Sequence, residues 1–233
     1  NILINTQLAS RLVEGSVTWL YYSDRLVEFA LGTFAVALGT IVLPRLSRFY
    51  AEGDRENLAH TVNWGLNLSL IIGIPAMIGL YILAEPLLAL LFMRGEFGGA
   101  DVSMSAKSLA TYALSIPAFF IIRVFAPLYF ARKDTKTPVK FSLIAIGTNI
   151  VLQFMLVRYL QHAGLALSSS IAAWVNALLL IWGVTRSGMH SFSGFWNWQK
   201  LALFNANIAL IAYLLLIASF NTFWMEALFL WRL

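Results

Sequence analysis

The fold of this chain follows from residues 16–29, SVTWLYYSDRLVEF, which carry three ionisable side chains directly into a long apolar run. Residues 31–43 hold nothing more polar than two threonines. We therefore expect Asp24, Arg25 and Glu28 to lie at the mouth of a membrane span or inside it. Ionisable groups at that depth face a partner or water and mark a functional site. An interfacial anchor with snorkelling charges fits the same residues, and the stretch alone leaves both interpretations open.

The composition is that of an integral membrane protein. Of 233 residues, 60% are hydrophobic and 12% are charged, and the mean hydropathy is +0.76. A soluble domain carries about 25% charged residues. The chain has no cysteine, which excludes disulfides and thiolate metal sites. Its net charge of +5 is scattered between apolar runs, so it indicates loop topology and gives no reason to expect nucleic acid as a partner.

Apolar runs of about 20 residues predict an all-α transmembrane helix bundle. We expect about six whole spans, with partial spans at residues 1–10 and from 223 onward. The whole spans are predicted over residues 23–44, 58–84, 106–131, 139–159, 165–184 and 201–220, with a short interfacial helix over 86–93. Pro44 is expected to end the first whole span. Pro117 and Pro127 are expected to bend the third, which carries Arg123 as a buried cation beside an aqueous cavity.

The distribution of Lys and Arg between alternate loops predicts the orientation in the membrane. The loops after the first, third and fifth spans hold nine of these residues, and the opposite loops hold five. The richer side is therefore predicted to be cytoplasmic. It follows that the end of the first span that carries Asp24 and Arg25 is predicted to lie toward the outer side.

The sequence contains no recognisable set of catalytic or cofactor-binding residues, so we expect that the protein is not an enzyme. The three histidines, His60, His162 and His190, lie in different loops at spacings unsuited to a shared metal ion. We expect neither a metal nor a cofactor. Two amides, Asn149 and Gln153, lie one turn apart on one face of the fourth span.

Several separated motifs resemble the MurJ (MviN) family of lipid II flippases, in the same order and over essentially the whole chain. They are residues 16–29, 39–47 (GTIVLPRLS), 92–97 (FMRGEF), 132–140 (RKDTKTPVK) and 162–168 (HAGLALS). The resemblance implies one lobe of the two-lobed multidrug/oligosaccharidyl-lipid/polysaccharide exporter fold, in the bacterial inner membrane. Residues 1–233 would form the carboxy-terminal lobe, and we expect the chain to be a fragment that lacks the amino-terminal lobe and the end of the last helix.

The resemblance also implies roles for individual residues. An arginine that matches Arg25 faces a cationic cavity in this family and receives the headgroup of lipid II, with Asp24 and Glu28 holding it when the cavity is empty. Arg123 falls where family members often have a basic residue. Some members resemble sodium-coupled carriers, and the matching positions here are neutral: Asn5, Asn149 and Gln153. A weak cation site is the most they imply, so coupling to the membrane potential is expected instead.

The expected partners are lipid II, membrane lipids and the amino-terminal lobe of the same protein, and the expected activity is flipping of lipid II by alternating access for cell-wall synthesis. Two other functions remain open. One is a related carrier, either a drug or cation antiporter or a flippase for another lipid-linked oligosaccharide. An antiporter would need an intramembrane carboxylate that titrates, and only Asp24 and Glu28 qualify. A non-transport scaffold of envelope assembly would tolerate loss of Arg25.

Overall fold

The structure is a computed structural model that describes residues 2–187, 204–211, 213, 214 and 217. Within these residues the secondary structure is helical. The elements are α1 (Ile2–Ala9), α2 (Ser16–Glu52), α3 (Arg55–Ile82), α4 (Ala84–Phe92), α5 (Gly99–Ala113), α6 (Ile116–Ala131) and α7 (Lys136–Arg186), followed by a helical segment at 204–211. The expected all-α membrane bundle is therefore confirmed.

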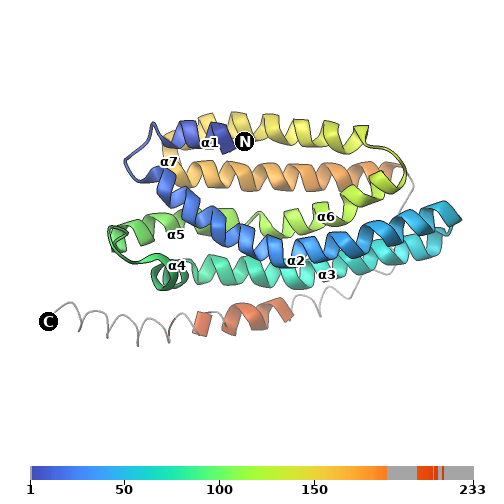
Figure 1. Cartoon of the computed structure of the whole chain (residues 1–233), viewed down its shortest axis with the longest axis horizontal. Helices are drawn as coiled ribbons and strands as arrows, with labels where there is room; N and C mark the ends of the chain where they lie inside the picture. The colour runs from blue at the N-terminus through green and yellow to red at the C-terminus, as the bar shows by residue number, and fades with distance from the viewer. Residues whose placement is uncertain (1, 188–203, 212, 215–216, 218–233) are drawn as a thin grey trace.

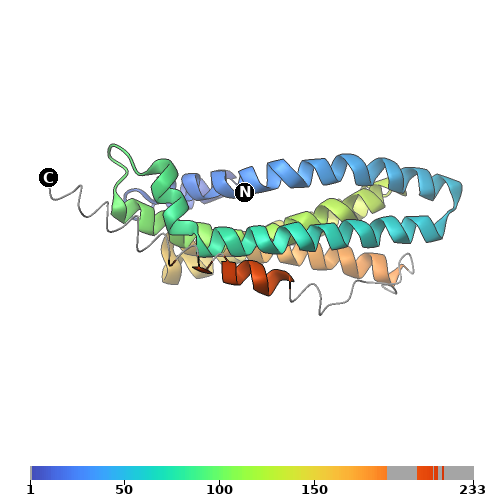
Figure 2. The same ribbon diagram turned by 90° about the horizontal axis from the view of Figure 1, so that it is seen from below.

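The long helices lie side by side as an elongated bundle (Figures 1 and 2). Stretches long and apolar enough to cross a membrane are Arg55–Ile82, Gly99–Ala131 and Lys136–Arg186. The last, α7, is 51 residues long and folds back on itself at Gln161, whose φ of 50° and ψ of −129° interrupt the helix. Its two halves therefore form the fourth and fifth predicted spans as an antiparallel pair.

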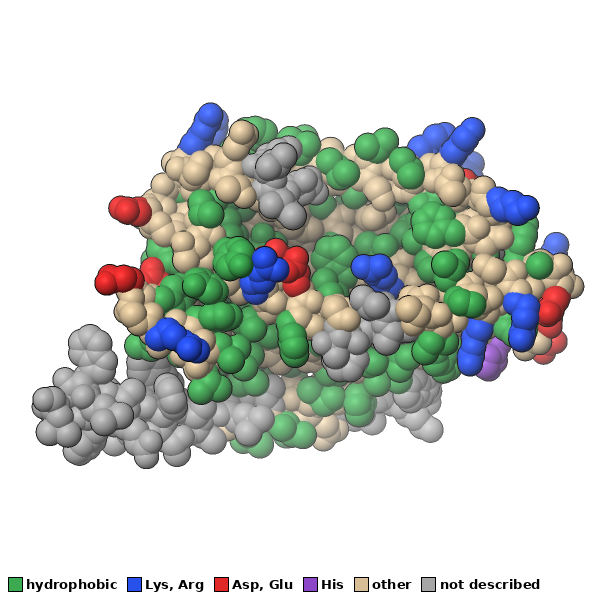
Figure 3. All heavy atoms as spheres, in the orientation of Figure 1, with side chains coloured by type: hydrophobic (Ala, Val, Ile, Leu, Met, Phe, Trp, Pro, Cys, Tyr) green, Lys and Arg blue, Asp and Glu red, His purple; other side chains and the backbone are tan. Residues whose placement is uncertain are grey.

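The loops gather at the two ends of the bundle in the alternation that the sequence predicts (Figure 1). One end carries the connection from α1 to α2, the segment around α4 and the turn at Gln161. The other end carries the turn at Gly53 and the loop of residues 132–135, together with the end of α7. In the face of Figure 3, charged side chains are concentrated at these ends, with a small group near the middle. Which end is cytoplasmic stays a prediction.

Two clusters of buried apolar side chains hold the bundle together. One centres on α2, α3, α6 and the second half of α7, and includes Val42, Val62 and Phe125. The other joins α2, α4, α5 and the turn of α7, and includes Leu20, Leu88 and Leu165. In a membrane, close packing between helices replaces the hydrophobic effect as the main source of helix association. The two clusters therefore position α2 against both α5 and α6, where the candidate site lies.

The expectation that Pro44 ends a span is wrong. Helix α2 continues past it to Glu52 and stops only at Gly53, which adopts the left-handed conformation with φ 72°. A proline inside a helix removes one backbone hydrogen bond. Here Val42 and Leu46, on either side of it, are fully buried in the core, and this packing holds the helix together across the proline.

Pro117 lies where the third span is interrupted, as predicted, whereas Pro127 lies inside the continuous helix α6 (Ile116–Ala131). Helix α5 ends at Ala113 and α6 begins at Ile116, with Pro117 in its first turn. The indole of Trp174 donates a hydrogen bond of 2.8 Å to the carbonyl oxygen of Leu114, a group freed by this break. The expected burial of Arg123 is wrong, because its side chain is exposed on α6. Ile122 and Val124 beside it face the inside, so the helix turns the arginine outward.

The remaining predicted elements are present within the described residues. Helices α3 and α4 match the second span and the short interfacial helix. Asp54 caps α3 by accepting a hydrogen bond of 3.0 Å from the backbone N–H of Asn57, and hydrogen bonds from Asn57 hold the pKa of this carboxyl below its ordinary value. Of the sixth predicted span, residues 204–211 are helical. His190, Lys200 and the seventh span lie outside the described residues.

Candidate functional site

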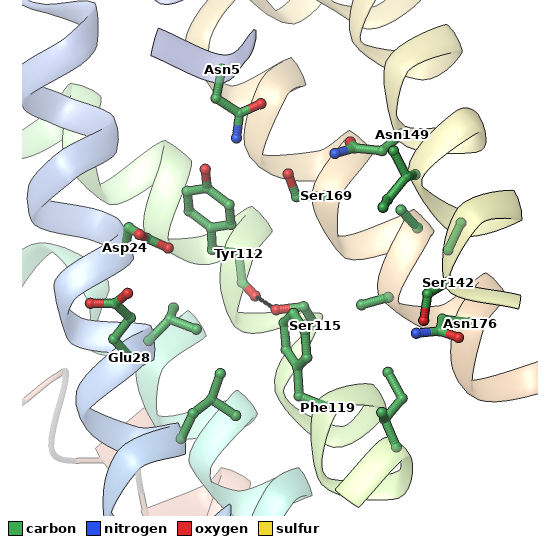
Figure 4. A pocket seen from close by; sticks show the side chains of 17 residues that line it. Asn5, Asp24, Glu28, Tyr112, Ser115, Phe119, Ser142, Asn149, Ser169 and Asn176 are labelled. Atoms are coloured by element: carbon green, nitrogen blue, oxygen red, sulfur yellow. Dashed lines mark hydrogen bonds between the residues drawn. The ribbon is translucent and has the colours of Figure 1, made fainter. Parts of the chain in front are cut away.

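A cavity of about 420 Å³ opens between α1, α2, α5, α6 and both halves of α7 (Figure 4). Its acidic lining residues are Asp24 and Glu28, both on α2. The amides are Asn5, Asn149 and Asn176, and the hydroxyls are Tyr112, Ser115, Ser142 and Ser169. Apolar side chains, among them Val27, Phe119 and Ile146, complete the wall. The cavity therefore combines an apolar wall with polar groups that come from distant parts of the chain.

Arg25 forms an ion pair with Glu28 at the edge of this cavity. Its Nη1 lies 2.8 Å from Oε2 of Glu28, one turn along α2 as the spacing predicts. The guanidinium also lies over the ring of Tyr21, 4.8 Å from the ring centre. About half of each side chain in the pair is exposed. Glu28 lines the cavity and Arg25 does not, so the arginine is held just outside the lining and keeps donors available on its exposed side.

Asp24 does not share in this pair, contrary to the expectation that it also holds Arg25. Consecutive residues of an α-helix point about 100° apart, so the carboxylate turns away from its neighbour. It turns toward Tyr112 of α5 instead (Figure 4). Asp24 lines the cavity and also a smaller one of about 120 Å³, with Asn5 and Tyr112 shared between the two linings.

The three amides predicted as a weak cation site meet in space. Gln153 donates its Nε2–H to Oδ1 of Asn5, although 148 residues separate them. Asn149 lines the cavity together with Asn5 and is buried, as is Gln153. Because Asn5 already accepts from Gln153, one oxygen of the group is engaged within the protein.

Arg123 lies outside the lining of the cavity. Phe119, four residues earlier and therefore on the same face of α6, does line it. The exposed guanidinium therefore lies one helical turn beyond Phe119 along α6, toward the end of the bundle that carries the loop of residues 132–135.

Sequence reasoning missed Tyr112, Ser115, Ser142, Ser169 and Asn176 as members of this site. A signal was present in α7. Its two halves carry the same spacing, Ser142, Ala145, Ile146 and Asn149 in the first and Ser169, Ala172, Ala173 and Asn176 in the second, and all eight residues line the cavity. Positions i, i+3, i+4 and i+7 form one helix face. Small and polar residues on such a face of a membrane span predict a polar surface that a neighbouring helix can approach closely.

Neither of the two described histidines, His60 and His162, lines the cavity. His60 is exposed, and His162 is buried at the turn of α7, with its Nε2 3.1 Å from the carbonyl oxygen of Met104. Among the residues that the structure describes, no group of three His, Cys, Asp or Glu side chains could hold a metal ion.

Comparison with known proteins identifies the family. The family model "Lipid II flippase MurJ" matches residues 1–233. The "Probable lipid II flippase MurJ" of Vibrio cholerae is 42% identical over 210 residues, which are 90% of this chain and 39% of that protein. The "Lipid II flippase MurJ" of Burkholderia cenocepacia is 40% identical over 199 residues, 84% of this chain and 38% of that protein.

A solved structure has the same architecture. The "Lipid II flippase MurJ, inward closed conformation" is 26% identical and superposes with a TM-score of 0.74. The match covers 95% of this chain and 50% of that one, so the chain spans about half the length of the solved protein and about two fifths of the curated relatives. With a family model that matches from the first residue to the last, this chain belongs to the lipid II flippase MurJ family.

Proposed function

We propose that this chain forms one lobe of a pathway that carries lipid II from the cytoplasmic to the outer face of the bacterial inner membrane. The observation that carries the proposal is the ion pair of Arg25 with Glu28, a lining residue of a polar cavity within a bundle of helices long and apolar enough to cross a membrane. Lipid II would be moved unchanged, by alternating access, as a precursor for the cell wall. We propose transport and no chemical step.

The physical problem of such transport is the headgroup. It consists of a pyrophosphate, sugars and a peptide, and each polar group costs several kcal/mol, roughly 2 to 7, to move into an apolar medium without a hydrogen-bond partner. The polyprenyl tail meets no such cost and can stay in the bilayer. A cavity with amide, hydroxyl and carboxylate groups along membrane spans provides partners along the way.

Arg25 suits the contact with pyrophosphate. Its guanidinium stays charged and offers paired N–H donors that match two phosphate oxygens. In the structure these donors are partly engaged by Glu28. We infer that the phosphate replaces the carboxylate when the headgroup enters, so the arginine is never left without a counter-ion.

Arg123 and the three amides complete the proposal. Arg123 lies one helical turn beyond Phe119, a residue of the cavity wall. An exposed cation within a membrane span requires water or a polar partner rather than lipid. Asn5, Asn149 and Gln153 carry no charge, and a hard cation prefers carboxylate oxygens. We therefore propose that the membrane potential acts on the charges of Arg25 and Arg123, and that the amides are at most a weak cation site.

A chimera tests the function directly. Residues 1–233 replace the matching segment of the Vibrio cholerae relative, and the chimera is expressed in a bacterium depleted of its own flippase. We expect growth with the wild-type segment, and accumulation of lipid-linked precursor on the cytoplasmic face with Arg25→Ala. Arg48→Ala on the same helix is the matched control, because Arg48 is exposed, lies 3.7 Å from Glu52 and over the ring of Phe49, and does not line the cavity. Full growth of Arg25→Ala at normal protein level would overturn the proposal.

A further inference from the structure

We propose that the cavity beside Asp24 binds a primary ammonium group on the peptide of the lipid II headgroup, while the pyrophosphate stays with Arg25 at the mouth. This inference rests on the proposed function and divides the headgroup between two subsites. The volume of about 420 Å³ falls within the range of roughly 300 to 1,000 Å³ that is typical of small-molecule pockets. It suits a part of the headgroup rather than the whole.

The charges of the lining are entirely acidic. Asp24 and Glu28 line the cavity, and none of the lining residues is Lys, Arg or His. Arg25 neutralises Glu28 at 2.8 Å, but within the described residues no ion pair includes Asp24. A carboxylate among membrane spans requires a counter-ion, a hydrogen-bond donor or water. Asp24 therefore lies at the cavity wall without an ion-pair partner among the described residues.

Two of the four hydroxyl groups in the lining donate their protons to the backbone. Ser115 donates its hydroxyl proton to the carbonyl oxygen of Tyr112 at 2.6 Å, within the break between α5 and α6. Ser169 donates its proton to the carbonyl oxygen of Leu165 at 3.1 Å, within α7. With these protons engaged by the backbone, each oxygen has only lone pairs left for a ligand.

Two buried amides supply further unused acceptors. Oδ1 of Asn149 and Oδ1 of Asn176 are buried and lack a hydrogen-bond partner. Asn149 is only 1% exposed, and its amide points into the cavity (Figure 4). A buried acceptor without a donor is unfavourable, and a ligand that brings the donor removes this cost. These amides are independent evidence for a donor-bearing ligand, since they lie on α7 and Asp24 lies on α2.

The chemistry of this lining selects the ligand. An ammonium group carries one positive charge and three N–H donors, which matches an unpaired carboxylate surrounded by free acceptors. A pyrophosphate has only acceptors and negative charge, so Asp24 and the amide oxygens repel it. Arg25, which offers donors from outside the lining, has the opposite preference. The two subsites therefore orient the headgroup, with its peptide inward and its phosphates at the mouth.

The test uses two probes that differ at one atom group: lipid II with a free amine on its peptide, and the same lipid with that amine acetylated. The purified chimera is titrated with each. We expect the wild-type chimera to bind the free amine about tenfold more tightly, as one hydrogen bond to a charged group predicts. Asp24→Asn, which keeps the size of the side chain, should lose this preference and bind both lipids alike. Glu52→Gln, the same change elsewhere on α2, should keep it.

The comparison of the two lipids needs no variant, so a folding defect in Asp24→Asn leaves the proposal testable. Equal binding of both lipids by a wild-type chimera that supports growth overturns the ammonium subsite and leaves the proposed function standing. If Asp24→Asn weakens the binding of both lipids equally, the ammonium subsite is also overturned. The carboxylate would then act independently of the amine, either by exchanging a proton or by stabilising the structure. A well-expressed chimera that binds neither lipid and supports no growth contradicts the proposed function itself.

Discussion

The indole Nε1–H of Trp19 donates a hydrogen bond of 2.8 Å to Oδ1 of Asp101, 82 residues further along the chain. The other oxygen of Asp101 accepts a hydrogen bond of 3.0 Å from the backbone N–H of Gly98 at the start of α5. The ring of Trp19 also meets the ring of His162 edge-on, with 4.9 Å between the ring centres. One side chain of α2 thus connects α5 and the turn of α7 at the same end of the bundle.

Trp19→Phe is expected to destabilise the bundle, because it keeps an aromatic ring and removes the N–H donor. Loss of one hydrogen bond to a charged acceptor predicts a decrease of about 1.5 kcal/mol in the free energy of unfolding. Unfolding of the chain in detergent, followed by circular dichroism against denaturant, measures it. Trp182→Phe on the exposed face of α7 is the control and should change little. Equal effects of both substitutions would contradict a stabilising role for this hydrogen bond.

Two glycines of α7 are expected to respond oppositely to alanine. A Cβ at Gly164 would lie 2.6 Å from the carbonyl oxygen of Leu156, where the two halves of the helix meet, and backbone cannot move aside cheaply. Gly164→Ala should therefore destabilise by about 1–3 kcal/mol, the usual cost of overpacking. A Cβ at Gly147 meets nothing within 4 Å, so Gly147→Ala should stabilise by about 0.5 kcal/mol through helix propensity. The same unfolding assay measures both, and a neutral Gly164→Ala would show that the turn relaxes.

Much of the fold was predictable, because membrane spans are local features of the sequence. Apolar runs predicted the helices α3 and α4 and, as one bent span over residues 106–131, most of α5 and α6, and the spacing of Arg25 and Glu28 predicted their pair. The continuation of α2 past Pro44 was not predictable, since it depends on burial of Val42 against other helices. Span patterns likewise do not show which face of a helix points inward, which is why Arg123 was expected to be buried.

The cavity was only partly predictable, for a related reason. Asp24 and Glu28 stand out locally, as charges next to an apolar run. Tyr112 and Ser169 do not, because they become cavity residues only through the packing of α5 against α7. The hydrogen bond between Asn5 and Gln153 joins residues 148 positions apart in the sequence, and no local pattern predicts such a contact.

The orientation of the bundle predicts which loops are accessible from outside the cell. Lys136 begins α7 at the end whose loops are predicted to be richer in Lys and Arg, and Glu96 lies in the loop before α5 at the opposite end. Both side chains are exposed. Single cysteines at these positions, in a chain that has no other, are treated with an impermeant thiol reagent on intact cells. We expect labelling at position 96 and none at 136, and the reverse would invert the proposed orientation.

Variants of Arg25 and Glu28 in the chimera can distinguish two effects: that of charge balance on the protein level, and that of the guanidinium on transport. Arg25→Ala leaves Glu28 without its partner among membrane spans, so lower protein levels are expected along with lost transport. Arg25→Ala combined with Glu28→Gln removes both charges, and the stranded carboxylate with them. The double variant should regain most of the protein level and still fail to move lipid II, because no donor fork remains for the phosphate. Arg25→Lys should give intermediate transport, since it keeps the charge and loses the fork.

Immunoblots of membrane fractions give the protein level, and growth of the depleted strain together with precursor accumulation gives transport. A double variant that regains transport together with protein level would show that Arg25 serves only to neutralise Glu28, and the interfacial-anchor interpretation of this stretch would then hold. A double variant that remains scarce would show that the pair has a structural role beyond charge balance. Recovery of protein without recovery of transport is the result that the phosphate contact requires, because only that contact depends on the guanidinium itself.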